Sequence, residues 1–315
     1  MPIDKMKVLI SSRSFGKNNR DVVNVLKNAG LEPLFNPLDR KPSEEELITM
    51  LDGVVGIIAG TENITKNVLS HATSLKVISR YGVGLDNVDL DTARQRGILV
   101  YSTPETPAIA VAELTLSLML NLLRKICKVS RSVQNNSWKP EMGNLLMGKT
   151  IGIIGLGRIG KRVVQLLQPF EVNILTYETK PDNKFIKKYK IQLTSFDTLV
   201  HTSDIISLHC PLNEKTHFLI GKDELSQMKT NAILINTARG GLIDENALYD
   251  ALKTDKIAGA AIDVFENEPY TGKLREFDNV ILTPHIGSYT VETRTNMEIE
   301  AATNLINGLK EMKIL

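Results

Sequence analysis

Three glycines constrain the fold of this chain more than any other feature: Gly155, Gly157 and Gly160. They lie between an apolar strand pattern at 150–154 and a helix pattern at 158–168. In this setting the first glycine allows a tight turn, the second lets backbone approach a pyrophosphate, and the third lets the helix pack against the strand. The free N–H groups and the dipole at the start of the helix attract an anion. The spacing therefore predicts a strand–turn–helix unit that binds a dinucleotide.

A carboxylate follows where such a unit requires one. Glu178 comes directly after the next apolar strand pattern, 173–177, at about the usual distance of roughly 20 residues from the glycines. An acid at this point accepts hydrogen bonds from the adenosine ribose hydroxyls and repels the extra phosphate of NADP. The sequence therefore favours NAD. Lys180 and Lys184 leave NADP open if either side chain turns toward the ribose.

Strand and helix patterns alternate along almost the whole chain. One set runs from residue 7 to 101 and a second from 149 to 285, with a helix expected at 109–130 between them and a last one at 291–309. Such alternation is typical of parallel α/β sheets. A chain of 315 residues exceeds one ordinary core, so we expect two domains. Because the last helix matches no part of the second set, we expect it to return to the first domain.

Composition excludes several classes of protein. The chain has 38 Lys and Arg against 36 Asp and Glu, so no overall charge favours nucleic acid or an anionic membrane. Its two cysteines exclude a disulfide scaffold and fit a reducing compartment. The apolar segment 108–123 is interrupted by Glu113 and Asn121 and is shorter than the roughly 20 residues of a membrane span. With no signal-peptide pattern, we expect a cytoplasmic protein that acts on small molecules without a metal.

Further motifs carry a family resemblance. They are RYGVGLDNVDL from Arg80, AVAELTLSLML from Ala110, the glycine motif, HCPLNEKTHFLIG from His209, NTARGGLIDENAL from Asn236, AAIDVFENEP from Ala260 and TPHIGS from Thr283. From residue 80 to 288 the chain resembles the D-isomer-specific 2-hydroxyacid dehydrogenases. The resemblance implies an α/β fold with an NAD-binding Rossmann domain at 103–285. It also implies a discontinuous, flavodoxin-like α/β substrate-binding domain at 1–102 and 286–315.

By this resemblance Arg239, Glu268 and His285 are the catalytic residues. Hydride transfer between a nicotinamide and a carbonyl carbon needs a proton to move to or from the oxygen, and imidazole suits that step near neutral pH. A carboxylate beside the imidazole favours its protonated form and fixes which ring nitrogen faces the substrate. An arginine stays charged and can hold the substrate carboxylate with its fork of donors.

The resemblance also implies binding residues. The turn Gly82-Val83-Gly84 would present backbone N–H groups to the substrate carboxylate. Asp263 would accept a hydrogen bond from the nicotinamide carboxamide, with Gly287 near the ring. The other residues expected around the cofactor are Arg158, Ile159, His209, Cys210, Pro211, Thr216, Thr237 and Ala238. Cys210 is expected to line the wall of the cofactor site and not to act as a catalytic thiol.

The substrate stays open between 3-phosphoglycerate, as used in serine synthesis, and a general 2-oxoacid such as glyoxylate, hydroxypyruvate or pyruvate. Phosphoglycerate enzymes of the family commonly carry arginine in the loop that corresponds to 58–61, where this chain has none. Pro107 replaces an asparagine of many relatives. Arg80, Arg131 and Lys139 remain candidates to meet a phosphate.

Assembly and regulation are further expectations. The sequence stops at Leu315, about where the shortest family members end, so we expect a short form without a regulatory domain for serine. The stretch 109–130 and the loop around Trp138 resemble the arm that pairs two nucleotide-binding domains, so we expect a homodimer through that domain. One alternative from another class is an NAD(H)-sensing, corepressor-like binding protein, because transcriptional corepressors share this fold and its catalytic residues.

Overall fold

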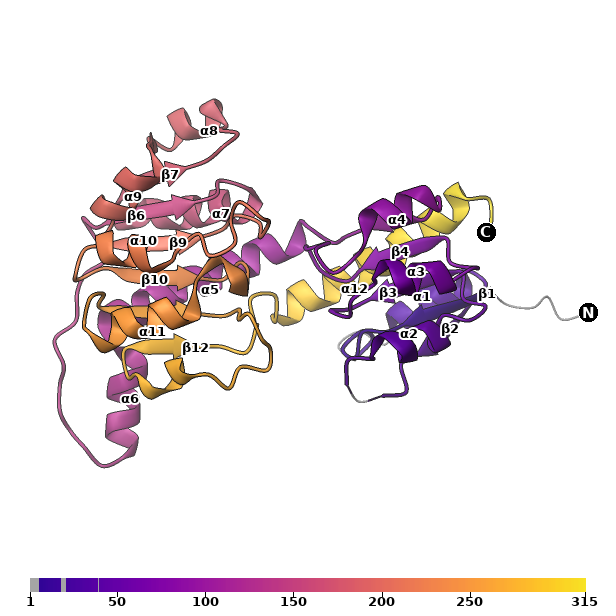
Figure 1. Cartoon of the computed structure of the whole chain (residues 1–315), viewed down its shortest axis with the longest axis horizontal. Helices are drawn as coiled ribbons and strands as arrows, with labels where there is room; N and C mark the ends of the chain where they lie inside the picture. The colour runs from indigo at the N-terminus through magenta and orange to yellow at the C-terminus, as the bar shows by residue number, and fades with distance from the viewer. Residues whose placement is uncertain (1–5, 18–20, 39) are drawn as a thin grey trace, which may run out of the picture. The chain divides into compact units, whose positions relative to one another are not determined.

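The structure is a computed structural model that describes residues 6–17, 21–38 and 40–315. The chain divides into two compact units (Figure 1). Unit 1 comprises Met1–Pro107 and Tyr289–Leu315, and unit 2 comprises Ala108–Ser288. The expected boundaries, after residue 102 and before residue 286, lie a few residues before these.

Unit 1 is built on a parallel five-stranded sheet in the order β2-β1-β3-β4-β5. This is the flavodoxin-like order, which reverses direction between β1 and β3. Its elements are β1 (Met6–Ile10), α1 (Asp21–Asn28), β2 (Leu31–Phe35), α2 (Glu44–Met50), β3 (Gly56–Ala59), α3 (Lys66–His71), β4 (Val77–Arg80), α4 (Leu90–Gln95), β5 (Leu99–Tyr101) and α12 (Val291–Glu311).

Both faces of this sheet are covered by helices. Successive side chains of a strand point to opposite faces, so a strand covered on both sides reads as an unbroken apolar run. In β1, Val8 and Ile10 pack with α1 and α12, whereas Leu9 between them packs with α2, α3 and α4. The C-terminal helix α12 also contacts β3 and β4 and is therefore part of the unit 1 core.

Unit 2 contains a parallel seven-stranded sheet in the order β12-β11-β10-β9-β6-β7-β8. Its central part has the Rossmann order, with the reversal between β6 and β9. Its elements are α5 (Thr106–Arg124, beginning at the boundary), α6 (Ile126–Gln134), β6 (Thr150–Ile154), α7 (Arg158–Leu167), η1 (Gln168–Phe170), β7 (Asn173–Tyr177), α8 (Asn183–Lys188), β8 (Gln192–Leu193), α9 (Phe196–Thr202), β9 (Ile205–Leu208), α10 (Lys222–Gln227), β10 (Ile233–Asn236), η2 (Gly240–Leu242), α11 (Glu245–Lys253), β11 (Gly259–Ile262), η3 (Lys273–Glu276) and β12 (Val280–Leu282).

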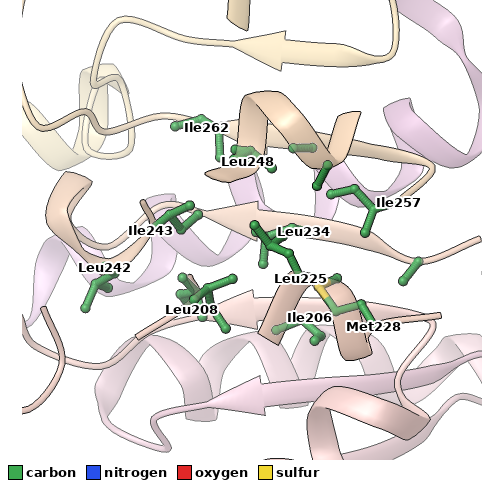
Figure 2. Close-up of a cluster of buried hydrophobic side chains, with 14 of the residues drawn as sticks. Ile206, Leu208, Leu225, Met228, Leu234, Leu242, Ile243, Leu248, Ile257 and Ile262 are labelled. Carbon is green, nitrogen blue, oxygen red and sulfur yellow. The ribbon is translucent and has the colours of Figure 1, made fainter. Parts of the chain in front are cut away.

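The unit 2 sheet is likewise buried on both faces. On one face, Ile206 and Leu234 of neighbouring strands pack with Leu225 of α10 and Leu248 of α11 (Figure 2). On the other face, α5 and α7 pack on the alternate residues of the same strands. The helices hold the strands so that all strand carboxyl ends open at one edge, which is where ligands of open α/β sheets bind.

The helix expected at 109–130 is wrong in one respect, because the structure has two helices there. α5 ends at Arg124, and Lys125 adopts a left-handed conformation with φ 53° before α6 begins. The Asn121 side chain accepts a hydrogen bond of 3.0 Å from the Cys127 N–H and so stabilises the break. Nothing in the apolar pattern marks this position.

The helix α5 is long and apolar enough to cross a membrane by length and composition, and it is the one such helix among the described residues. Half of its most apolar window is buried within the protein. Ala112 and Met119 on this helix are completely buried in the unit 2 core. α5 therefore packs as a core helix of a folded domain. Such core helices satisfy the same test of length and composition as a membrane-spanning helix.

Candidate active site

The glycine turn connects the central strand β6 to α7 in unit 2. Gly155 has φ 94°, and a Cβ there would lie 2.7 Å from the Cys210 backbone nitrogen. A Cβ on Gly160 would lie 2.1 Å from the Gly155 carbonyl oxygen, whereas a Cβ on Gly157 would enter open space. Gly157 is the N-cap of α7, with Arg158 and Ile159 as its first residues. The turn thus leaves room beside Gly157 for a phosphate group at the start of a helix.

Glu178 closes the far side of this turn. Its Oε2 accepts a hydrogen bond of 2.7 Å from the Leu156 N–H, and its Oε1 accepts one of 2.9 Å from the Lys180 N–H. Burial acts to raise the pKa of Glu178, but these bonds and one from Thr179 outweigh it, so the pKa lies below its usual value. The acid is ionised and lies against the glycine turn, while its contact with a ribose remains a prediction.

The loop that follows β9 lies beside the glycine turn. Burial lowers the pKa of His209 to about 3, so its imidazole is neutral. Its Nε2 lies 2.9 Å from the Ser207 hydroxyl, and its enclosed Nδ1 has no hydrogen-bond partner. Burial raises the pKa of the neighbouring Cys210 thiol to about 11, which is unsuited to a nucleophile.

Two other residues expected near the cofactor have structural partners. The Thr216 hydroxyl donates to the Pro211 carbonyl oxygen at 2.7 Å and so closes the loop after β9. The Thr237 hydroxyl, at the end of β10, lies 3.0 Å from the Thr115 hydroxyl of α5. These contacts fix the loop after β9 and join the end of β10 to α5. Contact of either hydroxyl with a cofactor stays a prediction.

His285 and Glu268 form a close pair in the loops that follow β12 and β11. The His285 Nδ1 lies 2.9 Å from Glu268 Oε2 and 3.1 Å from Oε1. Burial acts to raise the pKa of Glu268, but the hydrogen bond and charge of His285 and the charge of Arg239 outweigh it, so the pKa is lowered. The carboxylate therefore holds Nδ1 and leaves Nε2 of an exposed imidazole for another partner.

Arg239 follows β10 on the same edge of the sheet. The Asn236 side chain holds its backbone by donating to the Arg239 carbonyl oxygen at 2.8 Å and accepting from the Ala238 N–H at 3.0 Å. A Cβ on Gly240 would lie 2.0 Å from the Phe265 carbonyl carbon, so only glycine lets this turn pack against the loop after β11. Arg239 and Glu268 are brought close enough for the charge of one to act on the other.

Asp263 fixes the turn that carries His285. Its Oδ1 accepts bonds from the Thr283 hydroxyl at 2.6 Å and the Ile286 N–H at 2.8 Å, and its Oδ2 accepts from the Gly287 N–H at 2.9 Å. The His285 N–H donates to the Asp263 carbonyl oxygen at 2.9 Å. These bonds hold His285 at φ 54°, a conformation that side-chain-bearing residues rarely adopt. Burial raises the pKa of Asp263 despite them.

The expected substrate turn, Gly82-Val83-Gly84, belongs to unit 1 and follows β4. The Gly82 N–H donates to the Thr103 hydroxyl at 2.9 Å, so this group is already used within the unit. In the described chain, no backbone hydrogen bond uses the N–H groups of Val83 and Gly84. These two are the groups of the turn that remain available to an anion.

Two residues with a part in the site were missed from the sequence, Asn236 and Thr283. Each directly follows or ends a strand, and each hydrogen-bonds the backbone or carboxylate that positions a catalytic residue. A side chain of the Asn type at a strand end commonly bonds backbone two residues on, which could have indicated Asn236. Across the described part of the chain, no group of three or more His, Cys, Asp or Glu could hold a metal.

Comparison with known proteins assigns most of unit 2 to a known domain family. The sequence profile of the "D-isomer specific 2-hydroxyacid dehydrogenase, NAD binding domain" matches residues 116–287. The chain is 44% identical to the glyoxylate reductase of Thermofilum pendens over 86% of this chain and 83% of that protein. The chain belongs to the D-isomer specific 2-hydroxyacid dehydrogenase family.

Other members of the family are similar to this chain over nearly its whole length. The chain is 37% identical to the D-3-phosphoglycerate dehydrogenase of Archaeoglobus fulgidus over 98% of this chain and 58% of that protein, so it spans little more than half of that relative's length. The D-lactate dehydrogenase of Aquifex aeolicus, solved with NAD and lactic acid, superposes with a TM-score of 0.83 at 29% identity and covers 98% of this chain and 96% of its own. The α/β fold with its Rossmann domain is thus confirmed.

NAD is the cofactor of this family domain, and the residues present fit it. Gly155 and Gly160 admit no side chain, and the position beside Gly157 is open. The enclosed Nδ1 of His209 lacks a partner at the same edge, and Glu178 is ionised at the end of β7. These residues would hold the dinucleotide across the switch point of the sheet.

Proposed function

We propose that the protein is an NAD-dependent oxidoreductase that interconverts a small D-2-hydroxyacid and its 2-oxoacid. The observation that carries this proposal is the His285–Glu268 pair, with an Nδ1–Oε2 distance of 2.9 Å at the nucleotide-binding edge of unit 2. When bound, the nicotinamide gives or accepts a hydride. His285 then gives a proton from Nε2 to the carbonyl oxygen in reduction and takes it back in oxidation.

The other two residues assist that transfer. Ionised Glu268 stabilises the protonated imidazole and keeps its Nε2 directed away from the carboxylate. Arg239 binds the substrate carboxylate and polarises the neighbouring carbonyl. In unit 1, the backbone N–H groups of Val83 and Gly84 can bind a carboxylate.

Two substrate classes are proposed, because relatives of similar identity differ in name. One is named D-3-phosphoglycerate dehydrogenase, which favours 3-phosphoglycerate and a place in serine synthesis. Others are named glyoxylate reductase and hydroxypyruvate reductase, which favours small unphosphorylated 2-oxoacids.

The test is purified protein with NADH and a panel of 2-oxoacids, followed by loss of NADH absorbance and by the handedness of the product. We expect turnover of at least one 2-oxoacid to the D-isomer, abolished in His285→Gln. Tight NADH binding with no turnover on the whole panel would reject the enzyme and favour the NAD(H)-sensing binding protein.

We also propose a homodimer formed through unit 2. Large apolar side chains are exposed in the loop after α6, with Trp138 86%, Met142 89% and Leu145 69% exposed. Helix α6 itself buries no residue within the chain. Apolar surface of this extent supports a partner contact. Light scattering should give the mass of two chains, and a monomer with intact NADH turnover would contradict the proposal.

We also propose a cytoplasmic location. Cys127 is exposed and Cys210 is partly buried, and both are free. Free thiols are typical of a reducing compartment.

A further inference from the structure

Unit 1 has a buried acid at the edge where its sheet would bind a ligand. Glu62 lies in the loop after β3 and is only 3% exposed. Its Oε1 accepts hydrogen bonds from the Ser11 hydroxyl, directly after β1, and from the Gly60 N–H at 2.8 Å, directly after β3. The carboxylate therefore joins the carboxyl ends of the two strands between which the sheet order reverses.

A third loop is tied to the same residue. The Asn87 side chain donates to the Glu62 carbonyl oxygen at 2.6 Å, and the Asn87 carbonyl oxygen accepts from the Ile64 N–H at 2.7 Å. Asn87 lies in the loop that begins with the Gly82-Val83-Gly84 turn after β4. Glu62 is thus at the centre of the loops that follow β1, β3 and β4.

The Glu62 carboxylate has one oxygen that the described residues do not use. Its second oxygen, Oε2, accepts no hydrogen bond within the described chain and is not fully enclosed. Oε2 lies close to the end of β3, because a Cβ on Gly60 would be 2.9 Å from it, and that Cβ would also be 3.3 Å from the Ser12 Cα, just after β1. No lysine or arginine among the described residues forms an ion pair with Glu62.

Two arginines of unit 1, Arg294 and Arg80, are engaged with other groups. The Arg294 guanidinium lies 4.2 Å from the Tyr81 ring centre and 4.7 Å from that of Tyr289, and it donates to the Ser14 hydroxyl. Arg80 donates to the Tyr81 carbonyl oxygen. Glu62 therefore brings a carboxylate oxygen with no ion-pair partner among the described residues to the edge where ligands of such sheets bind.

We propose that Glu62 makes this enzyme select 2-oxoacids whose far end is neutral, such as a hydroxyl group, over those that carry a phosphate there. This inference rests on the proposed function and chooses between its two substrate classes. In a flavodoxin-like sheet, ligands bind at the carboxyl ends of the strands flanking the reversal, which are β1 and β3. A hydroxyl can donate to Oε2, whereas a phosphate brings nearly two negative charges toward it. Repulsion of the wrong ligand is an effective way to gain specificity.

The deciding measurement is the preference for hydroxypyruvate over 3-phosphohydroxypyruvate, as the ratio of their kcat/KM values with NADH. We expect the unmodified protein to prefer hydroxypyruvate by about tenfold or more. Glu62→Gln keeps an oxygen for Ser11 and Gly60 but removes the charge, so the ratio should fall at least about fivefold, chiefly through a lower KM for the phosphorylated acid. Glu32→Gln removes an exposed acid of β2 and should leave the ratio unchanged.

A preference of the unmodified protein for the phosphorylated acid would overturn the inference. So would an unchanged ratio in a folded Glu62→Gln protein. If Glu62→Gln does not fold, Glu62→Asp is measured instead, because aspartate retains the carboxylate. The preference for hydroxypyruvate should then survive even if the overall kcat/KM falls. Loss of that preference in Glu62→Asp would overturn the inference. Failure to reduce every 2-oxoacid tested would instead reject the proposed function itself.

Discussion

The pair formed by Glu268 and His285 predicts how far reduction slows when the carboxylate is neutralised. Glu268→Gln retains the size of the side chain and one acceptor oxygen. It removes the negative charge that stabilises the imidazole while it gives its proton in reduction. The kcat/KM for reduction should therefore fall.

The size of this loss follows from the geometry. Nδ1 lies 2.9 Å and 3.1 Å from the two carboxylate oxygens, which are distances of a charge-assisted hydrogen bond. Such bonds contribute about 1.5–3 kcal/mol. The side chains of His285 and Glu268 are 45% and 38% exposed, so solvent screens the pair and the lower end applies. Since about 1.4 kcal/mol corresponds to a factor of ten in rate, we expect kcat/KM for reduction to fall about tenfold.

Protonation of the Glu268 carboxylate limits how far the pair persists toward low pH. Burial opposes ionisation of Glu268, but the bond from His285 lowers its pKa below the ordinary value. A carboxyl group with a lowered pKa contributes stability that is present above its unfolded-state pKa and lost as pH falls through its folded-state pKa. The pair should therefore persist at every pH above the ordinary carboxyl range.

The assay is kcat/KM for reduction of the best 2-oxoacid in the unmodified protein and in Glu268→Gln. NADH affinity, measured by fluorescence, should be the same in both. Glu266→Gln neutralises an exposed acid of the same loop and should leave kcat/KM unchanged. Equal kcat/KM values for the unmodified protein and Glu268→Gln would refute the reasoning.

Three further predictions concern unit 2. His285→Gln should lower kcat by about 10²–10⁴-fold with NADH binding retained, and unchanged turnover would remove His285 from the mechanism. Gly160→Ala places a Cβ 2.1 Å from the Gly155 carbonyl oxygen and should lower the free energy of unfolding in urea by about 1–3 kcal/mol. Gly157→Ala places its Cβ in open space, so it should unfold as the unmodified protein does but bind NADH more weakly. Glu178→Ala should improve the use of NADP relative to NAD, and an unchanged ratio would contradict the ribose argument.

Features set by short stretches of sequence were predicted well. The glycine turn follows from steric demands within a few residues, since Gly155 and Gly160 have room for hydrogen only. The apolar patterns of β6 and α7 flank it at the expected residues. Glu178 could be located because its distance from the turn is set by one helix and one strand.

Features set by tertiary contacts were not visible in the sequence. The hydrogen bonds that the Asp263 carboxylate accepts from Thr283, Ile286 and Gly287 exist because β11 and β12 are neighbours in the sheet. The sequence predicted Asp263 as a cofactor contact and gave no sign that it holds the His285 turn. The break between α5 and α6 depends on one side chain, Asn121, and on a left-handed residue that the helical pattern does not require.

The bond between Glu178 and the Leu156 N–H has a consequence for ligand binding. The Glu178 carboxylate holds the glycine turn from within the protein at 2.7 Å, so the conformational entropy of that loop is lost when the chain folds rather than when a dinucleotide arrives. Such preorganisation raises affinity by reducing the cost of association. Substitutions at Glu178 should therefore weaken binding of either dinucleotide through a more mobile loop, in addition to changing which ribose is accepted.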